Sequence, residues 1–366
     1  MLLGILKESD DRRVAISPES VKKFKDKFEV KVETGAGANA QFSDKDYTAA
    51  GAEATDRKTV LSTADLVFSI DPINQEEAQS LKPGAILICQ FAPFNDDKLT
   101  VFLAEKGITA FSLDMVPRTT LAQSMDVLSS MASIAGYRAV LKATDFLPRY
   151  MPMLTTAAGT IPPAKVLILG AGVAGLQAIA TARRLGAVVE AFDTRAASKE
   201  EVESLGAKFV EVEGATDDKA AGGYAVEQSD DYKKKQAALI ADKAEKADIV
   251  ITTALLRGRP APTLVPKTTL DRMKAGSVVI DMASVTGGNC EVTKDKETVV
   301  YNGVSVVGHS NLSEEVAQHA SILYGKNIEN YLKLLWNEQG ELDFENEIVA
   351  KSCITHNKEN YYAKNA

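Results

Sequence analysis

The sequence predicts an α/β protein with two doubly wound, parallel-sheet domains. Three observations carry this prediction. Short apolar segments alternate with amphipathic helical segments in the first third of the chain, which is typical of a parallel sheet. A strand, a glycine-rich turn and a helix follow one another in the middle. The 366 residues, 45% of them hydrophobic, are enough for about two domains with cores of normal size.

The first domain begins with strand-like segments separated by polar and helical stretches. Pro18–Phe28 has helical spacing, and Ser17 stands where an N-cap is expected. The strands of this domain are predicted at Leu2–Leu6, Val30–Glu33, Leu66–Ile70, Ala85–Cys89 and Ile108–Phe111.

Two long helices are predicted on either side of the central unit. One runs from Ser124 to about Leu147 and links the domains, and the other runs from Ser313 to Trp336. Met151–Pro163, with three prolines, reads as a connector. We therefore expect residues 1–130 plus 312–366 to form one domain and 131–311 the other, with the cofactor in a cleft between them. The alternative is a simple split with an appended helical tail.

The central motif runs from Val166 to Gly175 and reads VLILGAGVAG. Gly170 permits a tight turn, Gly172 lets the backbone approach a pyrophosphate, and Gly175 lets the helix pack on its strand. Free N–H groups at the helix N-terminus supply an anion site. Helix formers continue to Leu185 and stop at Gly186. This pattern indicates a Rossmann-like dinucleotide-binding unit.

Asp193 ends the next strand and predicts which nucleotide binds. A carboxylate at this place accepts hydrogen bonds from the ribose hydroxyls of NAD(H) and repels the 2′-phosphate of NADP(H). Arg195, two residues later, could weaken that repulsion. The alternative is a glycine-rich turn followed by a structural aspartate. Further strands of this unit are predicted at Lys208–Glu211, Ile249–Thr252, Val278–Asp281 and Val304–Val307. Thr252–Leu256 follows a strand, where it could face the cofactor or be a buried strand end.

Composition excludes several function classes. A net charge of −8 argues against a nucleic-acid partner. The cysteines (Cys89, Cys290, Cys353) and the three histidines are too few and too far apart to predict a disulfide framework or a metal site. Charges at Lys7 and Glu8 are not typical of a signal peptide, and no apolar run approaches the ~18 residues of a membrane span. We therefore expect an intracellular protein without membrane insertion.

A polar segment precedes the first long helix. On a helix that starts near Gln123, the side chains of Gln123, Asp126 and Ser130 share one face, with Ser129 beside it. This face and Arg118 could meet the nicotinamide end of a dinucleotide. Alternatively, Ser124 or Gln123 caps the helix and Asp126 completes its first turn, which spacing alone favours.

Residues 214–236 are too long and polar for a plain loop. They predict either a lid, with Gly222 and Gly223 as hinge and Tyr224 over the site, or a charged surface loop. His309 and Cys290 are read as structural residues.

Taken together, these motifs resemble the soluble NAD(H)-binding component (domain I, alpha subunit) of proton-translocating NAD(P) transhydrogenases, which are related to alanine dehydrogenases. The resemblance covers nearly the whole chain. It rests on Arg12–Ala15, Pro117–Arg118, Ala122–Asp126, Ile134–Ala139, Gly170–Ile179, Ala191–Arg195, Gly222–Ala225, Thr252–Leu255 and Gly287–Cys290.

The resemblance implies a set of site residues. Arg118, Gln123, Asp126 and Ser129 match contacts to the nicotinamide half of NAD(H), with Gln123 orienting the rings. Tyr224 matches a residue on a loop that closes over the cofactor. The remaining cofactor-binding residues it implies are Thr119, Thr120, Leu121, Gly170, Gly172, Val173, Gly175, Asp193, Thr194, Arg195, Gly223, Gln236 and Leu255.

The implied reaction is direct, Re/Si-specific hydride transfer between NAD(H) on this chain and NADP(H) on a partner domain III, without a general base. A membrane component would couple it to proton translocation. The resemblance also implies a homodimer and a cytoplasmic location, peripheral at the inner membrane through partner subunits.

The chain departs from the family in places. Leu121 replaces a second arginine of the family's Arg-Ile-Ser-Arg-Ala-Gln motif, so one positive charge near the cofactor phosphates is lost. Arg257 and Arg259 stand where proline and lysine are usual.

Two alternatives remain. An alanine dehydrogenase needs a lysine and a histidine, and the corresponding places read Ser69–Pro72 and Ile88–Phe91. A non-catalytic NAD(H)-sensing module is the other alternative.

Overall fold

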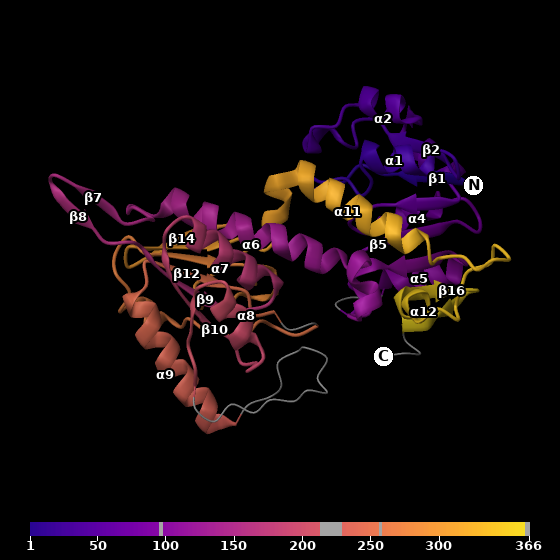
Figure 1. The fold of residues 1–366 in the computed structure, drawn as a ribbon. Coiled ribbons are helices and arrows are strands. Elements are labelled where there is room, and N and C mark those ends of the chain that lie inside the picture. The colour runs from indigo at the N-terminus through magenta and orange to yellow at the C-terminus, as the bar shows by residue number, and fades with distance from the viewer. Residues whose placement is uncertain (95–97, 213–228, 256–257, 363–366) are drawn as a thin grey trace. The chain divides into compact units, whose positions relative to one another are not determined.

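The computed structural model describes residues 1–94, 98–212, 229–255 and 258–362. They form two compact units, Met1–Met131 with Glu314–Ala366, and Ala132–Ser313. Each unit is an α/β body with its own sheet (Figure 1). The predicted α/β class with parallel sheets is confirmed.

The sheet of the first unit has the strand order β17-β16-β6-β5-β4-β1-β2-β3. Its neighbours pair in parallel, except that β16 is antiparallel to β6 and to β17. The C-terminal segment therefore extends the sheet that the N-terminal segment begins. The strands are β1 (Leu2–Ile5), β2 (Glu29–Glu33), β3 (Ala52–Thr55), β4 (Leu66–Phe68), β5 (Ile86–Cys89), β6 (Thr109–Ser112), β16 (Cys353–His356) and β17 (Glu359–Asn360).

Helices and 3-10 turns connect these strands. Ser17 caps α1 as predicted, because its side chain accepts a hydrogen bond from the N–H of Ser20. The helix ends at Phe24 rather than Phe28. The helices of this unit are α1 (Pro18–Phe24), α2 (Asp44–Ala50), α3 (Arg57–Thr63), α4 (Gln75–Gln79), α5 (Lys98–Lys106), α11 (Ala317–Leu332) and α12 (Glu347–Ser352). The 3-10 turns are η1 (Ala38–Ala40), η2 (Leu113–Met115), η3 (Thr120–Met125) and η6 (Leu312–Val316).

Both long helices begin later than predicted. The first, α6 (Val127–Phe146), follows the 3-10 turn η3 and one extended residue, Asp126. The second predicted helix, Ser313–Trp336, divides into η6 and α11. Helical periodicity does not distinguish a 3-10 turn from the first turn of an α-helix, so both predicted starts are too early.

The sheet of the second unit has the order β11-β10-β9-β12-β13-β15-β14. All neighbours are parallel except β14, an edge strand that was not predicted. Its turn into β15 contains Asn302 and Gly303, both with positive φ, as tight hairpins require. The strands are β9 (Lys165–Leu169), β10 (Val188–Phe192), β11 (Lys208–Phe209), β12 (Ile249–Thr252), β13 (Val278–Asp281), β14 (Thr298–Tyr301) and β15 (Val304–Gly308).

Helices of the second unit pack on both hydrophobic clusters of its sheet. They are α7 (Val173–Arg184), α8 (Ser198–Ser204), α9 (Asp230–Lys246) and α10 (Lys267–Leu270), with the 3-10 turn η5 (Ser284–Thr286). In the part of the chain that the structure describes, we find no helix with the length and apolar character needed to cross a membrane.

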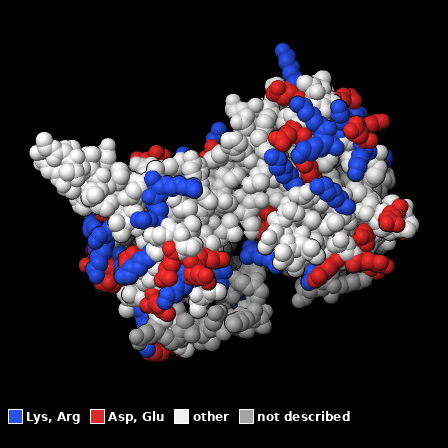
Figure 2. Space-filling model, in the orientation of Figure 1, with Lys and Arg blue, Asp and Glu red and all other residues white. Residues whose placement is uncertain are grey.

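The predicted connector at Met151–Pro163 is in fact a β-hairpin of β7 (Leu154–Thr156) and β8 (Gly159–Ile161). Figure 1 shows it extending away from the body of its own unit. Residues 151–164 contain no charged side chain, and the hairpin is correspondingly white in Figure 2, whereas acidic and basic side chains are interspersed over α1 and α2.

Helix α6 lies against the start of α7 at Gly136. A Cβ atom built on Gly136 would lie 2.1 Å from the carbonyl oxygen of Ala174, which is backbone and cannot rotate away. A side chain at this position therefore forces the two helices apart.

We predict that Gly136→Ala lowers the free energy of unfolding by about 1–3 kcal/mol, because overpacking outweighs the helix propensity of about 1 kcal/mol that alanine gains. Urea denaturation measures the change. Gly172→Ala is the control, since its added Cβ meets no atom within 4 Å. Equal stability of both variants would contradict the packing argument.

Candidate functional site

The turn between β9 and α7, here called the glycine turn (residues 170–175), has the geometry expected of a nucleotide-binding loop. Gly170 has a φ of +106°, and its N–H donates to the carbonyl of Phe192 at 2.8 Å. A Cβ on Gly175 would lie 1.9 Å from the carbonyl oxygen of Gly170. Glycine is therefore required at both positions, at the first for backbone conformation and at the second for close packing.

The N-terminus of α7 is open. Gly172 is its N-cap residue, and among the described residues no side chain caps this helix. The first N–H groups of an α-helix have no partner within the helix, and they carry its positive dipole end. Val173, the first helical residue, is 43% exposed. The arrangement is suited to bind an anionic group such as a phosphate.

Asp193 joins the end of β10 to the glycine turn. Its Oδ2 accepts a hydrogen bond from the N–H of Ala171 at 2.7 Å. Arg195 donates to the same carboxylate from its backbone N–H, from Nε and from Nη2, each at 2.9 Å. Thr194, between them, is half-buried. A carboxylate accepts about four hydrogen bonds, so that of Asp193 is fully bonded inside the protein.

The end of β12 also contacts the glycine turn. The hydroxyl of Thr253 donates to the carbonyl oxygen of Gly170 at 3.1 Å. Two residues later, Leu255 is 52% exposed. In the same unit Cys290 is buried, and burial raises the pKa of its thiol to about 11. Its structural interpretation is consistent with this unreactive state.

In the first unit, η3 presents most of the predicted nicotinamide segment at the surface. Ala122 and Met125 are buried, and the carbonyl of Ser124 accepts hydrogen bonds from Asn327 at 2.9 Å and Asn330 at 3.2 Å, both on α11. The exposed residues of this segment include Arg118, Thr119, Thr120, Leu121 and Gln123.

Asp126 caps α6. Its Oδ1 accepts the N–H of Ser129 at 2.9 Å, and its Oδ2 accepts the hydroxyl of Ser129 at 2.6 Å. Both alternatives predicted from the sequence are wrong here. Gln123 precedes the helix and shares no helical face with Asp126, and the capping residue is neither Gln123 nor Ser124.

The remaining predicted residues lie at the other end of the 214–236 segment. Gly223 and Tyr224 are outside the described residues. Gln236 is half-buried and lies on α9, which begins at Asp230 behind the capping side chain of Ser229. The predicted loop therefore ends earlier than expected.

The strand ends of the first unit hold a buried polar network. Both carboxylate oxygens of Glu8 accept backbone N–H groups, from Ile70 at 2.7 Å and from Asp71 at 3.1 Å. Burial raises the pKa of Glu8 to about 7. Arg13 forms a buried ion pair with Asp11.

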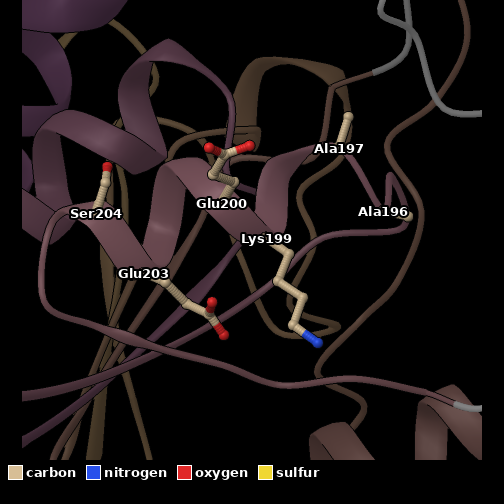
Figure 3. A pocket seen from close by; sticks show the side chains of 6 residues that line it. All are labelled: Ala196, Ala197, Lys199, Glu200, Glu203 and Ser204. Carbon is tan, nitrogen blue, oxygen red and sulfur yellow. The ribbon is translucent and has the colours of Figure 1, made fainter.

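A hollow of about 510 Å³ lies over α8 and the turn before it (Figure 3). Its lining contains no residue of the glycine turn, and Lys199 within it already pairs with Glu211 at 2.7 Å. We assign no ligand to it. The lining residues are Ala196, Ala197, Lys199, Glu200, Glu203 and Ser204.

The chain is similar to known proteins over almost its full length. Family models described as "Alanine dehydrogenase/PNT, N-terminal domain" and "C-terminal domain" match residues 4–135 and 139–363. An NAD(P) transhydrogenase alpha subunit of Rhodospirillum rubrum is 45% identical over 97% of this chain and 96% of its own length. The alpha subunit of Haemophilus influenzae is 39% identical over 98% of this chain and 71% of its own. An alanine dehydrogenase of Staphylococcus epidermidis is 29% identical over 92% and 88%.

Solved structures give the same result. A transhydrogenase from Sinorhizobium meliloti superposes with a TM-score of 0.90 and 44% identity, over 98% of this chain and 100% of the other. An L-alanine dehydrogenase superposes with a TM-score of 0.83 and 26% identity, over both chains in full. The chain therefore belongs to the alanine dehydrogenase/PNT family of nicotinamide-nucleotide-binding proteins, as a homologue of NAD(P) transhydrogenase alpha subunits.

Proposed function

We propose that this chain is the NAD(H)-binding component of a proton-translocating NAD(P) transhydrogenase, and that hydride passes directly between NAD(H) here and NADP(H) on a partner domain. The observation that carries the proposal is the glycine turn, with the open N-terminus of α7 on one side and Asp193 on the other. The similarity to subunits named as transhydrogenase alpha, over nearly the full length, supports the same activity.

The pyrophosphate of NAD(H) would lie over Gly172, against the N–H groups at the start of α7. Its adenosine ribose would bind Asp193. Because that carboxylate is fully bonded in the structure, a ribose hydroxyl replaces one of the bonds from the side chain of Arg195, which is 27% exposed and can turn away. The carboxylate would repel the 2′-phosphate of NADP(H), so we infer a preference for NAD(H).

In this proposal Arg118, Gln123, Asp126 and Ser129 contact the nicotinamide half, and Thr119, Thr120 and Leu121 lie close to it. The bond between Asp126 and Ser129 holds both side chains in one orientation before the nucleotide arrives. Hydride transfer between two nicotinamide rings moves no proton from a hydroxyl group, so no general base is needed. The contribution of these residues is to position the rings and exclude water.

The partners follow from the names of the relatives, which are subunits rather than whole enzymes. We infer a partner that binds NADP(H) and a membrane component that couples hydride transfer to proton translocation. The chain would then work as a homodimer in the cytoplasm, held at the inner membrane by those partners. Gly223 and Tyr224 would close over the bound nucleotide.

Alanine oxidation is the second candidate, because the family includes alanine dehydrogenases. The places where that reaction needs a lysine and a histidine hold other residues, and Gln90 donates to the hydroxyl of Tyr324 at 3.1 Å. Arg13 is bound by Asp11 rather than presented to a substrate carboxylate. These contacts argue against amino-acid oxidation. A non-catalytic NAD(H)-binding module is the third candidate.

Reconstitution distinguishes the three candidates. The chain is mixed with a domain III protein that carries bound NADP(H), and reduction of an oxidised NAD analogue by NADH is followed. We expect turnover that requires the added domain. Turnover with pyruvate and ammonium alone would identify a dehydrogenase. NADH binding without turnover in either assay would favour the sensing module.

We predict that Gly172→Ala weakens NADH binding at least tenfold, which is about 1.4 kcal/mol, while the free energy of unfolding changes by less than about 1 kcal/mol. The added methyl group meets no protein atom, but it occupies the space through which a pyrophosphate approaches the backbone. NADH fluorescence titration and urea denaturation measure the two quantities. Unchanged affinity would show that the phosphates bind elsewhere.

We predict that Gln123→Asn slows hydride transfer by at least about tenfold, or 1.4 kcal/mol of activation free energy, with the NADH dissociation constant nearly unchanged. The side chain is exposed, so the shorter amide costs no packing and acts only on ring orientation. Stopped-flow reduction of the NAD analogue with domain III present measures the rate. A parallel loss of rate and affinity would make Gln123 a binding residue instead.

A further inference from the structure

The turn after β13 is organised around one buried carboxylate. Asp281 is fully buried, and its Oδ1 accepts hydrogen bonds from the hydroxyl of Thr252 at 3.1 Å and the N–H of Ala283 at 3.0 Å. Its Oδ2 accepts from the N–H of Cys290 at 2.9 Å and the hydroxyl of Thr293 at 2.7 Å. Asp281 therefore connects the end of β12 to both ends of the turn at residues 283–293.

Gly288 lets this turn pass directly over the carboxylate. Its φ is +84°, and a Cβ at this position would lie 2.7 Å from Oδ2 of Asp281 and 2.8 Å from the Cβ of Thr293. The backbone conformation and the lack of space both require glycine. The position of the next residue, Asn289, is fixed as a result.

Asn289 holds the loop that follows β12, here called the 254–262 loop. Its Oδ1 accepts the N–H of Ala254 at 3.1 Å, and its Nδ2 donates to the carbonyls of Ala254 at 2.9 Å and Pro262 at 2.8 Å. The side chain is fully buried. One amide thus joins the two ends of the loop, and only one orientation of that amide satisfies all three bonds. The N–H of Ala261 also donates to the carbonyl of Thr286 at 2.9 Å.

The 254–262 loop lies next to the glycine turn. β12 pairs with β9, so the ends of these strands are neighbours at one edge of the sheet, and Thr253 bonds the carbonyl of Gly170. Leu255 is 52% exposed from this loop, and Val285 is 65% exposed from the turn that Asp281 organises. Both are apolar side chains presented at the edge where the nucleotide would bind.

We propose that Asn289 is a positioning residue for the nucleotide, which holds the 254–262 loop so that Leu255 packs against bound NAD(H), and that Asp281 fixes Asn289 for this role. The inference rests on the proposed NAD(H) site. An amide that only filled space could be replaced by an apolar side chain, whereas this one makes all three of its bonds to the two ends of a single loop. The loop bears an exposed apolar residue beside the phosphate-binding turn.

The test compares Asn289→Ala with a matched control, Ser277→Ala. Ser277 is also fully buried, and its hydroxyl donates to the carbonyl of Ala247 at 3.2 Å, but it precedes β13 at the opposite edge of the sheet. Both variants lose a buried polar side chain, so both are expected to unfold at a lower temperature. Thermal unfolding fixes an assay temperature at which both are folded.

We expect Asn289→Ala to raise the NADH dissociation constant about tenfold and to accelerate trypsin cleavage after Arg259, which lies in the 254–262 loop. Bound NADH should restore some of the protection. Ser277→Ala should change neither the affinity nor the cleavage rate.

An Asn289→Ala protein that binds NADH within twofold of the wild type overturns the inference, as does an equal loss of affinity in Ser277→Ala. Should Asn289→Ala not fold, Asn289→Asp gives the same test, because it keeps the side-chain volume and the acceptor for Ala254 while removing both donated bonds. Wild-type protein that binds no NADH overturns the proposed function as well, and the two failures are thereby distinguished.

Discussion

The backbone of α7 passes so close to the carbonyl of Gly170 that no side chain fits at Gly175. This contact fixes the helix on β9 and leaves its N-terminus at the edge of the sheet where the parallel strands end. The other features of the second unit depend on it. Gly136 lets α6 approach the same turn, and the N–H of Ala171 points at Asp193 because the turn is held there. A shift of α7 away from β9 would displace all of these groups together.

Two carboxylates stabilise this edge, and both receive hydrogen bonds from the segments around them. Burying a charge without partners costs several kcal/mol, so each carboxylate constrains the segments that bond it. Asp193 holds the glycine turn and Arg195, and Asp281 holds the turn that carries Asn289. The edge is therefore set before a ligand arrives. Preorganisation of this kind lowers the ordering cost of binding.

The glycine turn was predictable from sequence because each of its glycines answers a local backbone requirement, and spacing alone reveals such requirements. The start of α6 was less so, since Asp126 and Ser129 at helical spacing look the same as a polar face and as a cap. Edge strand β14 had a readable signal in Asn302-Gly303, a dipeptide typical of tight hairpins. Asn289 had none, because the backbone groups that it bonds lie 27 and 35 residues away in sequence. Long-range polar contacts leave no periodic trace.

The two units share an α/β architecture but differ in what occupies their strand ends. Residues 6–17, which follow β1, contain no glycine, and the charged groups there are bonded within the protein: Glu8 accepts two backbone N–H groups, and Arg13 pairs with Asp11. A ligand would have to break these bonds in a buried place, and breaking a buried ion pair costs several kcal/mol. The second unit instead offers the N–H groups at the open start of α7. This difference in chemistry, and not a difference in fold, is why we assign nucleotide binding to the second unit and give the first unit a role only through the segment around η3.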